Sequence, residues 1–235
     1  GTFQFQHRRA QHDDSHARFM SVLLAMAAGE TSRFTSANAT VVNLEKPAGS
    51  EFLPRIGLSV PENLNSAAKA LLASTHEWLF LLNDDQIYNP ATLTRLLAHQ
   101  RPVVTGLTTG RMFPFVPAIY GPQHADGSMT PIFRTPKMRG LWPIHYCGDH
   151  SLLIRRDVIE TMRQPWWAHS SERWPGRERV QHDVVFCDGV RDAGYDIVCD
   201  LDTPVGHLAV MPIVPQQNAD GSWSTGVRMS NDHWV

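Results

Sequence analysis

The part of the sequence best equipped for chemistry is residues 77–90, where five consecutive apolar residues lead into Asn83, Asp84 and Asp85. A short continuous apolar run predicts a strand that is buried on both faces of a parallel sheet. In open α/β sheets, ligands bind just beyond the carboxyl ends of such strands. Two adjacent carboxylates repel each other there, and Mg²⁺ or Mn²⁺ would relieve the repulsion and serve a phosphate-bearing substrate. The alternative is that these polar side chains cap a helix that begins near Pro90.

Cationic side chains follow two other predicted strands. Arg111 comes shortly after the apolar run at 102–107, and its planar guanidinium matches two phosphate oxygens at once. The His-Arg-Arg sequence at 7–9 follows an alternating stretch at 2–6, where it would meet a phosphate or a base. The alternatives are a surface arginine in the first case and a solvated loop in the second.

Strands and helices alternate in the first half of the chain. Residues 13–29 are a predicted helix, because apolar residues recur at helical spacing before Gly29. Two further helices are expected from Pro61 and over 90–99, each with leucines on its buried side. The predicted strands are 2–6, 39–44, 78–82 and 102–107. This alternation predicts an α/β domain with a largely parallel sheet.

The second half of the chain is more irregular. The polar loop at 168–179 is long enough to be a mobile lid that faces a substrate, or it is ordinary surface irregularity. The tryptophans at 142, 166, 167 and 174 would stack on a sugar or base, although core packing is the simpler account for at least two of them. The expected elements are an extended edge segment at 114–122, a hairpin turn or flexible loop at 124–128, a hairpin turn at 218–222, helices from 155 and after 183, and a strand at 197–199.

The composition narrows the possible functions. The chain has 235 residues, a formal net charge of −2 and a pI near 6.7, which argue against a strong nucleic-acid footprint. No apolar run reaches membrane-spanning length, and the first residues do not resemble a signal peptide. The three cysteines are far apart and form no CxxC pair, which fits neither a zinc site nor a disulfide framework. A reducing, cytoplasmic location is therefore expected.

In their order and spacing, four stretches resemble the GT-A glycosyltransferases, especially the family-2-like enzymes that use nucleotide-sugar donors. Residues 79–86 are similar to the strand that ends in the DxD motif, and 102–107 with Arg111 to the strand after that motif's helix. Residues 147–160 are similar to the glycine-containing segment that lines the sugar site. The sequence from 182 to 208 resembles the family's acidic pair, its Ala-Gly-Tyr helix end and its late histidine.

The resemblance implies a GT-A fold in one continuous domain, with a nucleotide-binding half at about 1–110 and an acceptor-binding half at about 111–235. It also implies a Mn²⁺ or Mg²⁺ ion under the donor diphosphate, held by Asp85 and His207. Asp84 would contact the ribose or the water shell of the ion. Asn83 stands where the first aspartate of DxD often sits, so contact with the nucleotide there would be through an uncharged amide.

The resemblance assigns the acceptor side as well. Asp183 matches the aspartate that acts as general base in inverting members, although by its position alone it reads as the N-cap of the following helix. His182 replaces the usual glutamate beside it. Gly148 and Asp149 match the donor-sugar segment, with a turn aspartate as the simpler alternative. Arg111 would hold the diphosphate.

The function expected from the sequence is a metal-dependent glycosyltransferase that moves a sugar from a UDP- or GDP-sugar donor to an acceptor hydroxyl. The first alternative is a nucleotidyltransferase with related strand-end carboxylates, although no glycine-rich phosphate loop follows the first predicted strand. The second is a non-catalytic nucleotide- or carbohydrate-binding module, which Asn83 and His182 would suit. The sequence does not name the acceptor.

Overall fold

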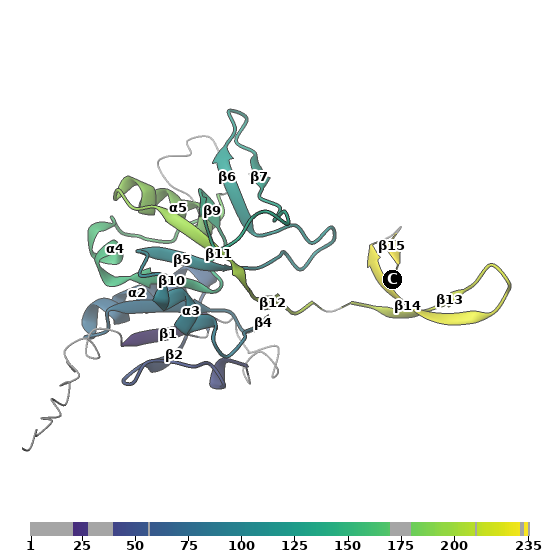
Figure 1. Cartoon of the computed structure of the whole chain (residues 1–235), viewed down its shortest axis with the longest axis horizontal. Coiled ribbons are helices and arrows are strands. Elements are labelled where there is room, and N and C mark those ends of the chain that lie inside the picture. Colours follow the sequence, from purple (N-terminus) through teal and green to yellow (C-terminus); the bar gives the residue numbers. More distant parts are fainter. Residues whose placement is uncertain are drawn as a thin grey trace, which may run out of the picture.

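The computed structural model describes residues 21–27, 40–55, 57–169, 180–209, 211–230 and 233–234. Its main feature is a seven-stranded sheet with the strand order β2-β1-β3-β10-β5-β11-β8 (Figure 1). Five of these strands run in one direction, while β10 and β8 run in the other. The predicted α/β class with a mostly parallel sheet is therefore confirmed. The strands are β1 (Val22–Ala27), β2 (Glu51–Arg55), β3 (Trp78–Leu82), β5 (Val103–Leu107), β8 (Leu141–Ile144), β10 (Leu152–Arg155) and β11 (Ile197–Pro204).

Helices cover both faces of the sheet and give two separate hydrophobic clusters. Helices α2 (Val60–Ala73), α4 (Arg156–Thr161) and α5 (His182–Asp192) contribute to the first cluster, together with Leu79 and Leu81 of β3. Helix α3 (Thr92–Ala98) contributes to the second, together with the even-numbered residues of the same strand. Successive side chains of a strand point to opposite faces, so a strand in this middle layer must be apolar throughout.

Strand β3 has the bounds predicted from the sequence, and all five of its residues are buried. The predictions for the next elements are also confirmed. Helix α2 buries Leu64 and Leu71 and leaves Leu72 half-buried, and α3 buries its three leucines. Strand β5 follows α3 as expected. Each of these elements has a spacing of apolar residues that is typical of its own type of secondary structure, which is why the sequence alone predicts them.

The helix predicted at 13–29 is wrong where the structure describes it, because residues 22–27 form β1. Val22 to Met26 are at most 5% exposed, with Leu23 and Ala25 in one cluster and Leu24 in the other. A continuous apolar run satisfies helical spacing by chance, and burial on both faces decides in favour of a strand. The predicted strand at 2–6 and the cations at 7–9 lie outside the described residues, as do residues 170–179 of the expected lid.

The strand predicted at 39–44 is also wrong, since residues 40–42 are helical and Val41 packs in the second cluster. The edge strand is instead β2, which lies between the predicted strand at 39–44 and the helix expected from Pro61. Its side chains are exposed or half-buried, so it carries no strong apolar pattern. Pairing with β1, from Leu23 opposite Glu51 to Ala27 opposite Arg55, is what makes it a strand.

Smaller sheets extend the second half. Strands β6 (Ile119–Gln123), β7 (Met129–Pro131) and β9 (Tyr146–Cys147) form a three-stranded sheet above the main one (Figure 1). The predicted hairpin at 124–128 is confirmed, because the His124 N–H donates to the Ser128 carbonyl at 2.9 Å. Strand β11 is longer than the predicted 197–199. The terminal hairpin is confirmed as well, and comprises β13 (Ile213–Gln217) and β14 (Trp223–Ser230), with β15 (His233–Trp234) beside β14.

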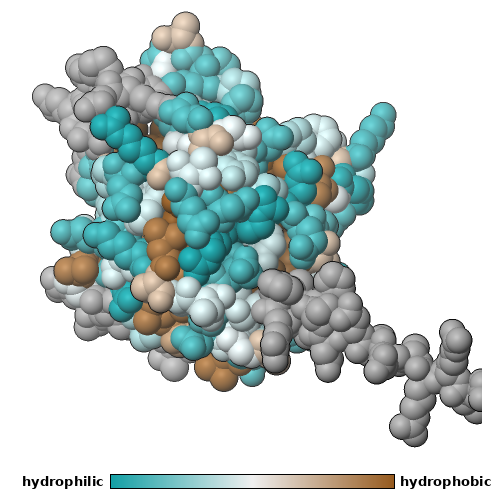
Figure 2. Space-filling view, turned by 90° about the vertical axis from the view of Figure 1, so that its left-hand side faces the viewer, coloured by the Kyte–Doolittle hydropathy of each residue, from teal (hydrophilic) through white to brown (hydrophobic). Residues whose placement is uncertain are grey.

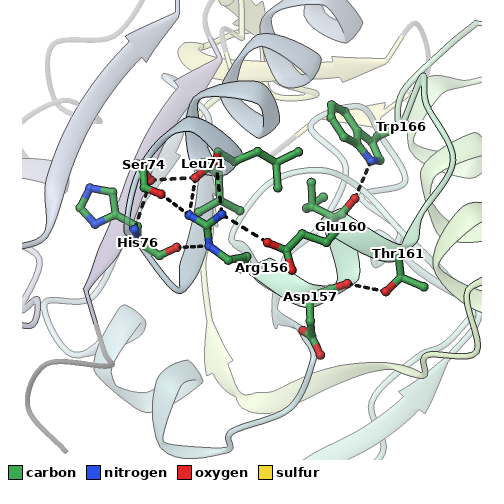
Figure 3. A network of polar contacts seen from close by, with 10 residues as sticks. Leu71, Ser74, His76, Arg156, Asp157, Glu160, Thr161 and Trp166 are labelled. Atoms are coloured by element: carbon green, nitrogen blue, oxygen red, sulfur yellow. Dashed lines mark hydrogen bonds and ion pairs between the residues drawn. The ribbon is translucent and has the colours of Figure 1, made fainter. Parts of the chain in front are cut away.

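The end of α2 is joined to α4 by one arginine (Figure 3). The Arg156 guanidinium donates to the carbonyls of Leu71 and Ser74 at 2.6 Å and of His76 at 2.8 Å. These carbonyls lie at or just beyond the carboxyl end of the helix, where backbone acceptors lack helical partners and a cation is favoured. Arg156 therefore connects the helix end to the segment that leads into β3.

Two of the four tryptophans that could stack on a sugar or base belong to the core, as the simpler account predicted. Trp166 is 2% exposed and donates its ring N–H to the Ile159 carbonyl at 3.1 Å. Trp167 is stacked on Phe186, with the ring centroids 4.4 Å apart. Trp142 is partly exposed on β8, and position 174 lies outside the described residues.

The face on the left-hand side of Figure 1 is mainly hydrophilic, with hydrophobic residues scattered among polar ones (Figure 2). Single exposed apolar side chains of this kind are normal for a folded domain. Across the described stretches, no helix has the length and apolar character that a membrane crossing requires.

Candidate functional site

Four loops meet at one edge of the main sheet. Strands β3, β5 and β11 end there, because they run in the same direction. Strand β10 runs the opposite way between β3 and β5, so it begins at that edge. The loops are residues 83–85 after β3, 108–111 after β5, 205–207 after β11 and 148–151 before β10. Every site residue that the resemblance assigned is found in these loops or at the start of α5, while the candidate cations at 7–9 lie outside the described residues.

Asp85 and His207 are brought together by a two-residue ladder. Strand β4 (Gln86–Ile87) pairs with β12 (Gly206–His207), with Gln86 opposite His207. Next to this ladder, the Leu208 N–H donates to the Asp85 carbonyl at 2.7 Å. The side chains then lie with His207 Nε2 3.3 Å from Asp85 Oδ2. The two predicted metal ligands are therefore neighbours, although they are far apart in the sequence.

The two side chains are electrostatically matched. Burial would raise the pKa of Asp85, but the hydrogen bond with His207 and the positive charges around it hold that pKa below its ordinary value. The hydrogen bond with Asp85 raises the pKa of His207 against the effect of burial. His207 Nδ1 lies 2.7 Å from the Thr109 carbonyl, so the Nδ1 proton is committed there and Nε2 faces Asp85.

Arg111 is the third member of this cluster. Its guanidinium forms an ion pair with the same Asp85 Oδ2 that faces His207, and its side chain is 48% exposed. A half-exposed arginine at the mouth of a site can reach a ligand that enters from solvent. The position agrees with the predicted contact to a diphosphate, which stays a prediction.

Asn83 and Asp84 lie at the end of β3 and are half-buried. The Asn83 N–H donates to the Tyr88 hydroxyl at 3.2 Å, and Tyr88 itself packs edge-on against Phe80 beneath the turn. This contact fixes the backbone from which Asp84 and Asp85 project. Contact of Asn83 or Asp84 with a nucleotide stays a prediction.

The donor set can be compared with what a divalent cation needs. In the part of the chain that the structure describes, no group of three or more histidine, cysteine or acidic side chains is arranged to hold a metal ion. Mg²⁺ usually keeps several waters and is bound through one or two carboxylates together with substrate phosphates. Asp85 supplies one such carboxylate, and His207 adds an imidazole, which transition-metal ions accept more readily than Mg²⁺ does. The pair therefore fits a shared site, and fits it better for a transition-metal ion.

A second polar group lies beside the first. His182 Nε2 is 3.1 Å from Asp149 Oδ2, and Asp149 is only 8% exposed. Burial would raise the pKa of Asp149, but the hydrogen bond and the charge of His182 keep it low. Burial opposes the charged form of His182, yet the bond with Asp149 raises its pKa. The histidine that replaces the expected glutamate is thus a partner of Asp149. The predicted contact of Gly148 and Asp149 with a donor sugar is not tested by this geometry.

Asp183 lines a cavity of about 370 Å³ between the β6–β7 hairpin and the start of α5. It is not the N-cap of that helix, since Gln181 holds that position. Burial, and next the charge of Asp149, raise the pKa of Asp183 to about 6. A half-buried carboxylate with this pKa can accept a proton near neutral pH, because general bases work best when their pKa lies near the operating pH. The cavity is also lined by Tyr120, Gln123, Ser128, Tyr146, Gly148 and His150.

His150 is a residue of this edge that the sequence did not single out. Its ring centroid lies 5.8 Å from that of His207, and burial lowers its pKa to about 4. It also lines the cavity that contains Asp183. The only signal in the sequence is its place between Asp149 and the apolar strand that follows, which is too common a setting for a histidine to attract notice.

The arrangement has two ends with different chemistry. Asp85, His207 and Arg111 are suited to a cation and to anionic oxygens. Asp183 and the cavity are suited to a neutral polar molecule that gives up a proton. His150 lies between them.

Comparison with known proteins shows the fold. No protein-family model and no curated protein sequence matches the chain. Among solved structures, A197 from STIV matches with a TM-score of 0.56 and 13% identity, over 91% of this chain and 96% of that one.

A second solved structure is GalNAc-T7 with UDP, GalNAc and Mn²⁺, which matches with a TM-score of 0.57 and 10% identity. The match covers 82% of this chain and 44% of that one. Likeness at this level of identity extends to the fold and to no particular family within it. The chain has a GT-A-like fold, as the resemblance of its sequence predicted.

Proposed function

We propose that this protein is a metal-dependent glycosyltransferase that uses a nucleotide-sugar donor. The observation that carries the proposal is the contact between Asp85 and His207, at 3.3 Å, at the carboxyl edge of the parallel strands. Ligands of open α/β sheets bind at this edge. The GT-A-like fold and a structural neighbour that contains UDP and Mn²⁺ support the same interpretation.

The donor side of the reaction needs positive charge, because a diphosphate leaves as the sugar is transferred. Asp85 and His207 would hold a Mn²⁺ or Mg²⁺ ion, which when bound offsets the growing negative charge. Arg111 would add charge-assisted hydrogen bonds to the diphosphate oxygens. Asn83 and Asp84 would position the nucleotide, and Gly148 and Asp149 the donor sugar. Asn83, Asp84 and Asp85 precede Arg111 in the chain, while Gly148, Asp149 and His207 come from the proposed acceptor half of the single domain.

The acceptor side needs a base, because a hydroxyl must lose its proton as it attacks. Asp183 lines the cavity and has a pKa raised to about 6, so it is ionised at neutral pH yet still basic. A base of this kind contributes about 10²–10⁴-fold. An acceptor bound in the cavity would place its hydroxyl beside Asp183 and opposite the donor diphosphate.

The test is transfer or hydrolysis from UDP- and GDP-sugars in the presence of Mn²⁺. The change Asp85→Asn keeps the shape of the side chain but removes the charge, and we expect it to lower the rate by about 100-fold or more. The matched control is Asp196→Asn, which changes an exposed aspartate just before β11, at the opposite edge of the sheet, and should leave the rate unchanged.

The results separate the alternatives. Release of pyrophosphate from a nucleoside triphosphate, without sugar transfer, would indicate a nucleotidyltransferase. Tight donor binding without turnover on any acceptor would indicate a binding module. Failure of every UDP- and GDP-sugar to bind would remove the proposal.

A further inference from the structure

His150 has a feature that no contact within the described residues accounts for. Its Nε2 is shielded from solvent and has no hydrogen-bond partner among them. A buried polar atom without a partner is destabilising, so such atoms in folded proteins are few and call for an explanation. A bound ligand that carries an acceptor oxygen would supply the missing partner.

The local backbone is adapted to this ring. A Cβ atom at Gly148 would lie 2.2 Å from Cε1 of His150 and 2.9 Å from its Nε2. Contacts this short do not occur in real proteins, so any residue other than glycine at 148 would force the imidazole to move. Glycine at 148 therefore allows the His150 ring to lie directly against the backbone.

The surroundings of the ring define the kind of partner. The His207 ring is 5.8 Å away, and Asp149, Asp85 and Arg111 are the other charged groups that act on His150. On its other side the ring lines the cavity that contains Asp183. His150 thus lies between the proposed diphosphate site and the proposed acceptor site, where the bond between sugar and phosphate would be broken.

We propose that His150 is a donor-binding residue whose Nε2–H donates a hydrogen bond to a terminal oxygen of the leaving diphosphate. This inference rests on the proposed function. The bond would exist in the donor complex and strengthen as negative charge accumulates on that phosphate, since hydrogen bonds to charged acceptors are the stronger class. No covalent step or proton transfer is required of His150.

The first measurement is calorimetric binding of UDP, GDP and the corresponding monophosphates, each with Mg²⁺ and with Mn²⁺. For the diphosphate that binds the wild type, we expect His150→Leu to weaken binding by about 10- to 100-fold, as for a hydrogen bond to a charged group. The affinity for the monophosphate should fall much less in this variant, because the monophosphate lacks the terminal phosphate that His150 would contact. His150→Gln retains an N–H donor and should recover most of the diphosphate affinity.

Thermal unfolding distinguishes this role from a structural one. His150→Leu removes an unpartnered nitrogen, so its unfolding midpoint should equal or exceed that of the wild type. The matched control is His76→Leu, at a buried histidine just before β3, at the opposite edge of the sheet, whose ring also has a shielded nitrogen without a partner among the described residues. It should leave the affinity of the folded protein for the diphosphate unchanged.

Each outcome decides the inference. Equal diphosphate affinity in the wild type and His150→Leu overturns the role of His150 and leaves the proposed function standing. An equal loss for monophosphate and diphosphate, with a lowered unfolding midpoint, shows a structural role and also overturns it. If the wild type binds neither diphosphate with Mg²⁺ or with Mn²⁺, the inference and the proposed function both fail.

Discussion

At the scale of single residues, the site gives its carboxylates opposite properties. Asp85 and Asp149 each face a histidine, and their pKa values are held low. Asp183 is half-buried near Asp149, and its pKa is raised to about 6. Pairs of carboxylates whose pKa values are driven apart commonly divide the roles of charge stabiliser and proton acceptor.

This difference predicts the pH dependence of the reaction. If Asp183 is the base of the proposed reaction, activity should rise with pH through about 6, because the carboxylate would accept a proton only after losing its own. Asp149→Asn removes a negative charge that helps to raise the pKa of Asp183, so the acid limb should move to lower pH. The measurement is kcat/KM of the wild type and the variant between pH 4.5 and 8. Identical acid limbs in the two proteins would contradict the assignment of Asp183.

The pH dependence of stability provides an independent test of the raised pKa of Asp183. A group whose pKa is raised on folding contributes stability below its unfolded pKa and loses that contribution as the pH rises through the folded value. Asp183→Asn should therefore gain in unfolding midpoint relative to the wild type as the pH is raised from 4 to 8. A difference that shrinks with rising pH would contradict the raised pKa.

At the scale of elements, Arg156 connects two parts of the chain that frame β3. We expect Arg156→Met to lower the free energy of unfolding by about 2–3 kcal/mol, because several carbonyls at the end of α2 lose a charged donor. Chemical denaturation measures this loss. Arg163→Met, at an exposed arginine just after α4, is the control and should cost less than about 0.5 kcal/mol. Equal values for the two variants would show that the contacts of Arg156 contribute little.

The sequence predicted the elements whose pattern is local. Strand β3 was found because an unbroken apolar run ends at a sharp polar boundary, and α2 and α3 because their leucines recur at helical spacing. Strand β1 was misread as a helix since its apolar run satisfies both patterns, and only burial between two layers distinguishes them. Strand β2 has no pattern of its own and depends on pairing with β1.

The identity of most site residues could be predicted from the resemblance to a known family, but their arrangement in space could not. The approach of His207 to Asp85 depends on a ladder of two residue pairs between distant segments, which no local pattern encodes. His150 reaches the site because β10 is inserted in the reverse direction between β3 and β5. Pairing over such distances is decided by the whole fold and leaves no periodic signal.

At the scale of the whole molecule, the chain divides into a compact body and an arm. Among the residues that the structure describes, the two hydrophobic clusters include none beyond Val205. The β13–β14 hairpin extends away from the body (Figure 1), and its Ile213 and Trp223 are 70% and 68% exposed. The arm therefore contributes little to the stability of the body.

Removal of residues 211–235 should change the unfolding midpoint of the body by less than about 2 °C, since none of the arm's described residues belongs to a core cluster. Metal-dependent activity on a small acceptor should also persist, because Asp85, Asp183 and His207 are all retained. Calorimetric unfolding of the truncated and full chains measures the first effect. A fall of about ten degrees or more would show that the arm packs on the body.

The shortness of the β4–β12 ladder has a consequence for turnover. Segments that are held by few backbone bonds open locally at much lower free energy than the sheet to which they are attached. Opening these two residue pairs would carry His207 away from Asp85 while β3, β5 and β11 stay folded. In the proposed reaction, the diphosphate product and its ion could then leave the site. The β4–β12 ladder would thus act as a latch that closes the site. Hydrogen exchange should show the latch directly, with the Leu208 amide exchanging far faster than the Leu153 amide in the sheet; equal protection of the two would exclude it.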